Sequence, residues 1–234
     1  MYNITVKGES PCWNRNSTAF ADKGGKGVGI MIITISRQFG SGGNRVGRLV
    51  AEQLGMPFYD KNIINHVADK LGFSPEYVKQ VQEKPTGSFL FSMAMYSYGN
   101  AATDGLIPAE MRVSTAQTEF ILEKAAEGNG VFVGRCSDYI LRERDDVFSV
   151  FIYAEMEHRV KNIMQRYNIS EKEAIKLIQQ TDKRRAMFYN TNTHHRWGTK
   201  ESYHLMLDCG KLGFDATVEA VEYCARLYLE NKKK

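Results

Sequence analysis

Short apolar runs rich in β-branched residues recur along this chain and predict its strands. Residues 31–36 (Met-Ile-Ile-Thr-Ile-Ser) form a continuous run, which is typical of a parallel strand buried on both faces. Further short runs lie at 57–60, 130–135, 147–154 and 203–209. Segments with the apolar spacing of helices separate them. This alternation predicts an α/β three-layer sandwich with a mainly parallel five-stranded sheet.

The third strand comes late in the chain. It begins about seventy residues after the second, whereas a strand–helix–strand unit takes roughly thirty. Helix signals at 61–71, from Ser74 onward and at 112–127 fill this interval, which predicts a helical insertion over about 61–128. Such an insertion suits a subdomain that binds a small-molecule substrate. The Met- and Phe-rich stretch 88–96 within it is interpreted as core packing.

Between the first strand and the next helix, glycines predict a phosphate-binding loop. Backbone N–H groups of such a loop can close on an anion at the N-terminus of a helix. The Walker pattern G-x-x-x-x-G-K-[ST] is not met, because the loop has no lysine. A dinucleotide loop is matched only in part. Gly40 and Gly42 fit and Asp60 lies at the distance of the expected acid, but Arg45 stands where the third glycine belongs.

A cluster of charges precedes the last strand. Ser170 and Glu173 have the spacing of a capping box, which begins a helix that carries Asp182-Lys183-Arg184-Arg185. Asp182 and Arg185 share a face of that helix, while Lys183 and Arg184 point elsewhere. Residues 188–198 are predicted to form a mobile loop, within a lid over about 170–200. Phosphoryl transfer needs several cations and a closing lid. A glycine loop, then a helical insertion, then an arginine-rich helix with its loop therefore favour that chemistry.

Together these segments resemble the cytidylate kinase-like family of bacteria. The matching stretches are 36–43 (Ser-Arg-Gln-Phe-Gly-Ser-Gly-Gly), 58–61, 133–135, 182–186 and 197–203. The resemblance extends from about Met31 to Leu229. It implies a P-loop nucleoside-monophosphate-kinase fold. It also implies transfer of a phosphoryl group from ATP, with Mg²⁺, to a pyrimidine nucleotide such as CMP or to a similar small molecule.

The resemblance implies roles for individual residues. The donor ATP would be held by Gly40, Ser41, Gly42, Gly43, Asn44 and Arg45. The acceptor would be held by Asp60, Lys61, Arg135, Asp182 and Arg185. Lys183 and Arg184 would bridge both phosphates in the transition state.

The chain departs from the family pattern at the loop. Gly43 stands at the position of the Walker lysine, and Arg45 at that of the hydroxyl that binds Mg²⁺. Arg37 or Arg45 could supply the missing charge, and Ser36 or Ser41 could hold the metal; the residues leave both choices open. Lys61 and His66 also replace the serine and arginine expected beside the acceptor.

Three functions are therefore carried forward. The first is an ATP-dependent kinase with CMP as the default acceptor. The second is a nucleotide-binding pseudokinase or sensor that kept the fold without turnover. The third, an NAD(P)-dependent oxidoreductase, is supported only by Gly40, Gly42 and Asp60.

Composition narrows the picture further. Hydrophobic residues at 43% and charged residues at 25% are typical of a globular chain. A net charge of +4 gives no indication of nucleic-acid binding, and no apolar run has the length of a membrane span. Four cysteines without a C-x-x-C pair favour ordinary thiols in a reducing, cytoplasmic compartment. The expected partners are a nucleotide and a small acceptor, and the oligomeric state stays open.

The two ends of the chain differ from the middle. Residues 1–30 lack an apolar period and are expected to be a disordered leader, or an extension upstream of a true start at Met31. One kinase-like domain is predicted over 31–231, with its last helix at about 215–229. Residues 232–234 are then expected to be a solvated basic tail.

Overall fold

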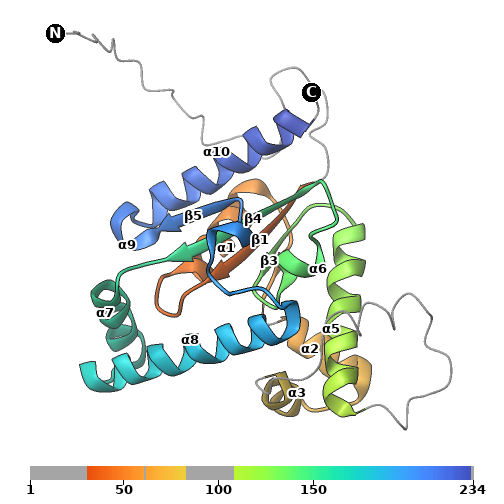
Figure 1. The fold of residues 1–234 in the computed structure, drawn as a ribbon, viewed down its shortest axis with the longest axis horizontal. Coiled ribbons are helices and arrows are strands. Elements are labelled where there is room, and N and C mark those ends of the chain that lie inside the picture. The colour runs from red at the N-terminus through yellow and green to blue at the C-terminus, as the bar shows by residue number, and fades with distance from the viewer. Residues whose placement is uncertain (1–30, 61, 83–107, 233–234) are drawn as a thin grey trace.

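The computed structural model describes residues 31–60, 62–82 and 108–232 (Figure 1). Predictions for the leader at 1–30, for Lys61, for the stretch 88–96 and for residues 233–234 therefore lie outside the described residues. The strands are β1 (Ile32–Arg37), β2 (Phe58–Tyr59), β3 (Gly130–Val133), β4 (Val147–Tyr153) and β5 (Leu205–Asp208). The helices are α1 (Gly43–Leu54), α2 (Asn62–Leu71), α3 (Pro75–Gln82), α5 (Ala109–Ala126), α6 (Ser137–Ile140), α7 (Met156–Tyr167), α8 (Glu171–Thr193), α9 (Cys209–Leu212) and α10 (Phe214–Lys232), with a 3-10 turn η1 (Lys200–Ser202).

The five strands form one sheet in the order β2-β3-β1-β4-β5, and every pairing is parallel. This confirms the predicted five-stranded α/β fold, and the sheet is parallel throughout rather than mainly so. Since β1 lies between β3 and β4, its carboxyl end is flanked by the ends of both neighbours, with Ile35 opposite Val133 and Val150. Ligands of open parallel sheets bind at this edge.

Apolar cores on both faces hold the sheet between helices. Ile33 and Ile35 of β1 pack in a core with side chains of α1 and α10. Ile32 packs on the opposite face, in a core with α2, α3, α5 and α6. These three isoleucines are at most 1% exposed, as expected for a central strand covered on both sides. The three layers are visible in Figure 1.

The helix α8 is longer than predicted. The capping box of Ser170 and Glu173 is present at its start, but the helix continues to Thr193 through residues predicted to be a mobile loop. Tertiary contacts explain the difference, because Tyr189 is buried and its hydroxyl donates to Asp138 Oδ2 at 2.7 Å. Thr193 Oγ1 also donates to the Tyr189 carbonyl at 2.8 Å, within the helix. Burial thus outweighs the weak helix propensity of Asn and Thr.

Two other boundaries differ slightly from prediction. Helices α2, α3 and α5 occupy the described part of the insertion, and the last helix, α10, extends beyond residue 229. Lys232 belongs to α10 rather than to the tail, and its Nζ lies 2.8 Å from Asp145 Oδ1.

Among the residues that the structure describes, no helix combines the length and the apolar character that a membrane span requires.

Candidate functional site

A tight loop connects β1 to α1 at the carboxyl edge of the sheet. Gly40 and Gly42 have φ values of 83° and 88°, in the left-handed region where glycine carries no steric cost. A Cβ on Gly42 would overlap the ring of Phe214, and one on Gly40 would lie 3.0 Å from the Arg159 backbone oxygen. Both glycines are therefore required by conformation and by close packing. The loop places the N-terminus of α1 just after the carboxyl end of β1.

Ser41 shapes this loop from within. Its side chain is fully buried, and Oγ lies 2.9 Å from the Gln38 carbonyl oxygen and 3.1 Å from that of Ile152. Ser36 Oγ accepts a hydrogen bond from Trp197 Nε1 at 3.0 Å. Both hydroxyls are thus engaged within the protein, Ser41 Oγ as a donor and Ser36 Oγ as an acceptor. In the described part of the chain, no three His, Cys, Asp or Glu side chains gather as a metal site.

The position of Gly43 explains why no lysine stands there. A Cβ on Gly43 would lie 2.5 Å from Arg37 Cβ and 3.0 Å from Ile152 Cβ. The side chain of Arg37, the last residue of β1, thus fills the space that a residue at position 43 would need. Its guanidinium extends to the end of β3, where Nη1 would overlap a Cβ on Gly134.

Asp60 is the carboxylate beside this guanidinium. Arg37 Nη2 lies 3.9 Å from Asp60 Oδ1, and Asn44 Nδ2 donates to Asp60 Oδ2 at 2.7 Å. The side chains of Arg37 and Asp60 are 19% and 15% exposed. Burial lowers the pKa of Arg37, and the charge of Asp60 opposes that effect. Asn44, predicted in the donor site, thus links the first turn of α1 to the predicted acceptor residue Asp60.

Two further arginines complete the cluster. Arg185 of α8 donates from Nη1 to the Arg37 carbonyl oxygen at 2.8 Å. Burial first, and then the positive charges of Arg37 and Arg135, lower the pKa of Arg185 to about 9, against attraction from Asp182 and Asp60. Arg135 follows β3 with a φ of 59°. Arg37, Arg135, Arg185 and Asp60, which we name the arginine cluster, thus gather more positive than negative charge, and an anion would relieve their mutual repulsion.

Asp182, which the resemblance places in the acceptor site, contacts the loop between β1 and α1 and the helix α7. Its Oδ1 accepts the Phe39 N–H at 2.7 Å, and its Oδ2 pairs with Arg159 Nη1. Arg159 is only 6% exposed, because it pairs with Asp182 and contacts the loop at Phe39. Asn162 Nδ2 also donates to the Gly40 carbonyl at 2.9 Å. Asp182 therefore helps α7 and α8 to hold the loop between β1 and α1 (residues 38–42), which we call the phosphate loop after the role that the sequence predicts for it. Arg185, one turn later, reaches the arginine cluster.

Four further residues singled out in the sequence, Lys183, Arg184, Arg45 and His66, lie outside the arginine cluster. Lys183 and Arg184 occupy the exposed side of α8, and the Nη2 atom of Arg184 lies 3.5 Å from Thr181 Oγ1. The guanidinium of Arg45 stacks on Phe214, with Cζ 4.3 Å from the ring centroid. His66 packs on Phe120, with ring centroids 4.4 Å apart.

Sequence reasoning did not identify Arg159, Asn162 or Phe214 as loop-holding residues. They come from α7 and α10, more than one hundred positions from the loop in sequence. No local pattern marks them, because each resembles an ordinary helix residue.

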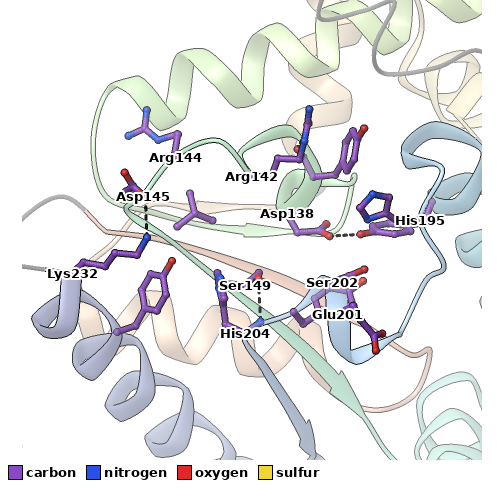
Figure 2. A pocket seen from close by; sticks show the side chains of 15 residues that line it. Asp138, Arg142, Arg144, Asp145, Ser149, His195, Glu201, Ser202, His204 and Lys232 are labelled. Carbon is purple, nitrogen blue, oxygen red and sulfur yellow. Dashed lines mark hydrogen bonds and ion pairs between the residues drawn. The ribbon is translucent and has the colours of Figure 1, made fainter.

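A separate cavity of about 370 Å³ lies between α6, the start of β4, the segment 201–204 and the end of α10. Figure 2 shows Asp138 at this cavity, with Arg144, Asp145 and Lys232 at one end. No residue of the phosphate loop or of the arginine cluster lines it. Burial raises the pKa of Asp138 to about 6, although the bond from Tyr189 and backbone N–H groups oppose the shift. The hydrogen bond from Tyr189 to Asp138 links α8 to α6.

The raised pKa of Asp138 predicts a pH-dependent effect on stability. Folding favours the protonated form, so Asp138 stabilises the fold at low pH, and this contribution is lost as pH rises from about 4 to about 6. The loss is at most about 3 kcal/mol, from the ordinary value of 3.8 to about 6. Asp138→Asn, which keeps an acceptor for Tyr189, is expected to gain more in unfolding free energy over wild type at pH 8 than at pH 5. Urea denaturation of both proteins at both pH values measures this, and an equal difference at the two would contradict it.

Comparison with known proteins agrees with the fold. The model of the cytidylate kinase-like family matches residues 32–211. An uncharacterized protein from Eubacterium ventriosum has a similar structure, with 24% identity, a TM-score of 0.64 and coverage of 84% of this chain and 98% of that chain. A shikimate kinase from Bacteroides thetaiotaomicron has 12% identity and a TM-score of 0.49, with coverage of 84% of this chain and 99% of that chain. A gluconokinase from Sinorhizobium meliloti has 16% identity and a TM-score of 0.47, with coverage of 86% of this chain and 97% of that chain. No curated protein matches the sequence.

The family match covers most of the chain, including the phosphate loop, the arginine cluster and α8. The similar structure from Eubacterium ventriosum supports the fold described above. The chain belongs to the cytidylate kinase-like family.

Proposed function

We propose that this protein transfers the γ-phosphoryl group of ATP, in the presence of Mg²⁺, to a small acceptor that carries an anionic group. CMP is the default acceptor. The observation that carries this proposal is the arginine cluster, which gathers three guanidinium groups and one carboxylate next to the first turn of α1. Phosphoryl transfer depends mainly on positioning and on neutralising phosphate charge, and these groups can do both.

In this proposal, the phosphate loop binds the donor ATP, and arginines of the arginine cluster bind the acceptor. The N-terminus of α1 would bind the donor phosphates through backbone N–H groups, and Arg135 and Arg185 would hold the anionic group of the acceptor. In the reaction, an acceptor oxygen forms a bond to the γ phosphorus while the bond from that phosphorus to the β–γ bridging oxygen breaks. ADP then leaves with the electron pair of the broken bond. With a CMP phosphate oxygen as nucleophile, no proton has to be removed.

A pseudokinase is the second candidate. Gly43 favours it, since this position holds no lysine to contact the donor phosphates.

The sheet topology excludes the third alternative, a dinucleotide-dependent oxidoreductase. A dinucleotide-binding sheet places its strands in the order 3-2-1-4-5-6, with the second strand next to the first. Here β3 lies between β1 and β2, so Asp60 does not follow a strand adjacent to β1.

A coupled assay of ADP release separates the two remaining candidates. The full chain is mixed with ATP and Mg²⁺ against a panel of nucleoside monophosphates, nucleosides and small alcohols. We expect turnover with one anionic acceptor, CMP first among them. No ADP above the rate without acceptor, together with a melting temperature that still rises with ATP, would favour the pseudokinase.

Arg185 provides a test of the acceptor site. Arg185→Met is expected to raise the KM for the acceptor by about 10–100-fold, because a charge-assisted hydrogen bond is worth about 1.5–3 kcal/mol. Arg185→Lys should recover part of this loss, and the KM for ATP should change much less. Arg166→Met, which removes an exposed arginine of α7, is the matched control. Equal effects on the two KM values would assign Arg185 a general structural role.

A further inference from the structure

The side chain of Arg37, at the end of β1, passes Gly43 and ends beside Gly134. Its Cβ and Cγ lie against Gly43, and its guanidinium lies against Gly134. A Cβ at either glycine would collide with it. Two glycines, one at the start of α1 and one just after β3, therefore make room for the side chain of a single arginine.

The charge of Arg37 is incompletely balanced. Asp60 Oδ1 is 3.9 Å away, longer than the roughly 2.7–2.9 Å of a charge-assisted hydrogen bond. Within the described residues, the buried Nε atom of Arg37 has no hydrogen-bond partner. The positive charge of Arg37 also acts on Arg185. Buried charges are normally paired, so this guanidinium is suited to an anionic ligand.

Arg45 does not share these features. It is exposed, and its guanidinium lies on the ring of Phe214 at the start of α10. Gly43 lies under Arg37, so the side chain of Arg37 occupies the place from which a loop lysine would project. Arg37 and Arg45, which the sequence left as alternatives for the missing charge, thus lie in different surroundings.

We propose that Arg37 takes the place of the loop lysine and binds the terminal phosphates of the donor nucleotide from the strand that precedes the loop. This rests on the proposed ATP-dependent function. It assigns the donor phosphates to Arg37 and leaves the acceptor to Arg135 and Arg185. A guanidinium offers paired donors in a rigid fork, which suits two phosphate oxygens, whereas lysine acts as a single compact charge.

Nucleotide affinity tests this assignment without any acceptor. Calorimetry of the full chain with ATP, ADP and AMP is compared for wild type, Arg37→Met and Arg37→Lys. Arg37→Met is expected to weaken ATP and ADP binding by about 10–100-fold and AMP binding by less than about threefold, because AMP lacks the β and γ phosphates. Arg37→Lys should recover part of the ATP affinity. Arg48→Met, which changes an exposed arginine of α1, is the control.

Other outcomes overturn the assignment in distinct ways. An equal loss of affinity for ATP and for AMP in Arg37→Met would assign Arg37 a structural role. A selective loss of ATP affinity in Arg45→Met, rather than in Arg37→Met, would assign the donor phosphates to Arg45. Weaker CMP binding with ATP unaffected would place Arg37 in the acceptor site. Wild-type protein that does not bind ATP would contradict the proposed function itself. If Arg37→Met does not unfold cooperatively, the ATP-to-AMP ratio of Arg37→Lys decides.

Discussion

Replacing Arg184 with alanine is expected to lower kcat by about 10³–10⁵, the range that an arginine on the transferred group contributes in phosphoryl-transfer enzymes. Arg184 lies on the exposed side of α8, next to Arg185 of the arginine cluster. The resemblance implies that Arg184 bridges both phosphates in the transition state, and α8 already contacts the phosphate loop through Asp182. Since its contact would form only in the transition state, the KM for the acceptor should change little.

Steady-state kinetics with saturating ATP and a varied acceptor measure this effect. Arg166→Ala, on the exposed side of α7, removes the same charge from a neighbouring helix and should retain wild-type turnover. Arg184→Ala with the wild-type kcat would remove Arg184 from the mechanism. A raised acceptor KM with an unchanged kcat would instead make it a binding residue.

Restoring the missing lysine at position 43 is expected to inactivate the protein. Any side chain at Gly43 brings its Cβ within 2.5 Å of Arg37 Cβ and 3.0 Å of Ile152 Cβ. These contacts involve atoms fixed to the backbone, so the loop has to shift. Overpacking of this kind costs about 1–3 kcal/mol of stability, and the displaced loop should no longer bind ATP. Thermal unfolding and ATP calorimetry of Gly43→Lys check both effects.

Two companion variants identify the cause. Gly43→Ala adds the Cβ without the amine, so a similar loss there would assign the effect to packing rather than to charge. The double variant Arg37→Gly with Gly43→Lys removes the closer of the two Cβ contacts and moves the cation to the loop. It should bind ATP better than Gly43→Lys alone. A Gly43→Lys protein that binds ATP more tightly than wild type would contradict the account of the loop.

Local patterns were sufficient for the framework of this fold. The apolar run of β1, the glycines of the loop and the capping box at Ser170 each depend on residues close in sequence, and each is present. Such local signals are fixed by chain geometry. Asp60 and Arg185 were assigned to one site by the resemblance alone, and the structure brings both into the arginine cluster.

The remaining contacts depend on packing between distant segments. Nothing near Arg159 in sequence shows that it turns inward to Asp182, and the glycine at 43 gave no sign that Arg37 covers it. The loop predicted at 188–198 was wrong over its first half because Tyr189 reaches Asp138, 51 residues earlier in the chain. The proposed choice of Arg37 over Arg45 rests on the paths of the two side chains, which sequence periodicity does not contain.

The most direct test of the central claim is transfer of label from ATP to an acceptor. The full chain is incubated with Mg²⁺, ATP labelled at the γ phosphorus, and CMP or another anionic acceptor, and the products are separated and identified. The account predicts labelled acceptor and ADP in equal amounts, with the label lost when Arg184 is replaced by alanine. ATP that binds but leaves its label on no acceptor would contradict the claim that this protein is a kinase.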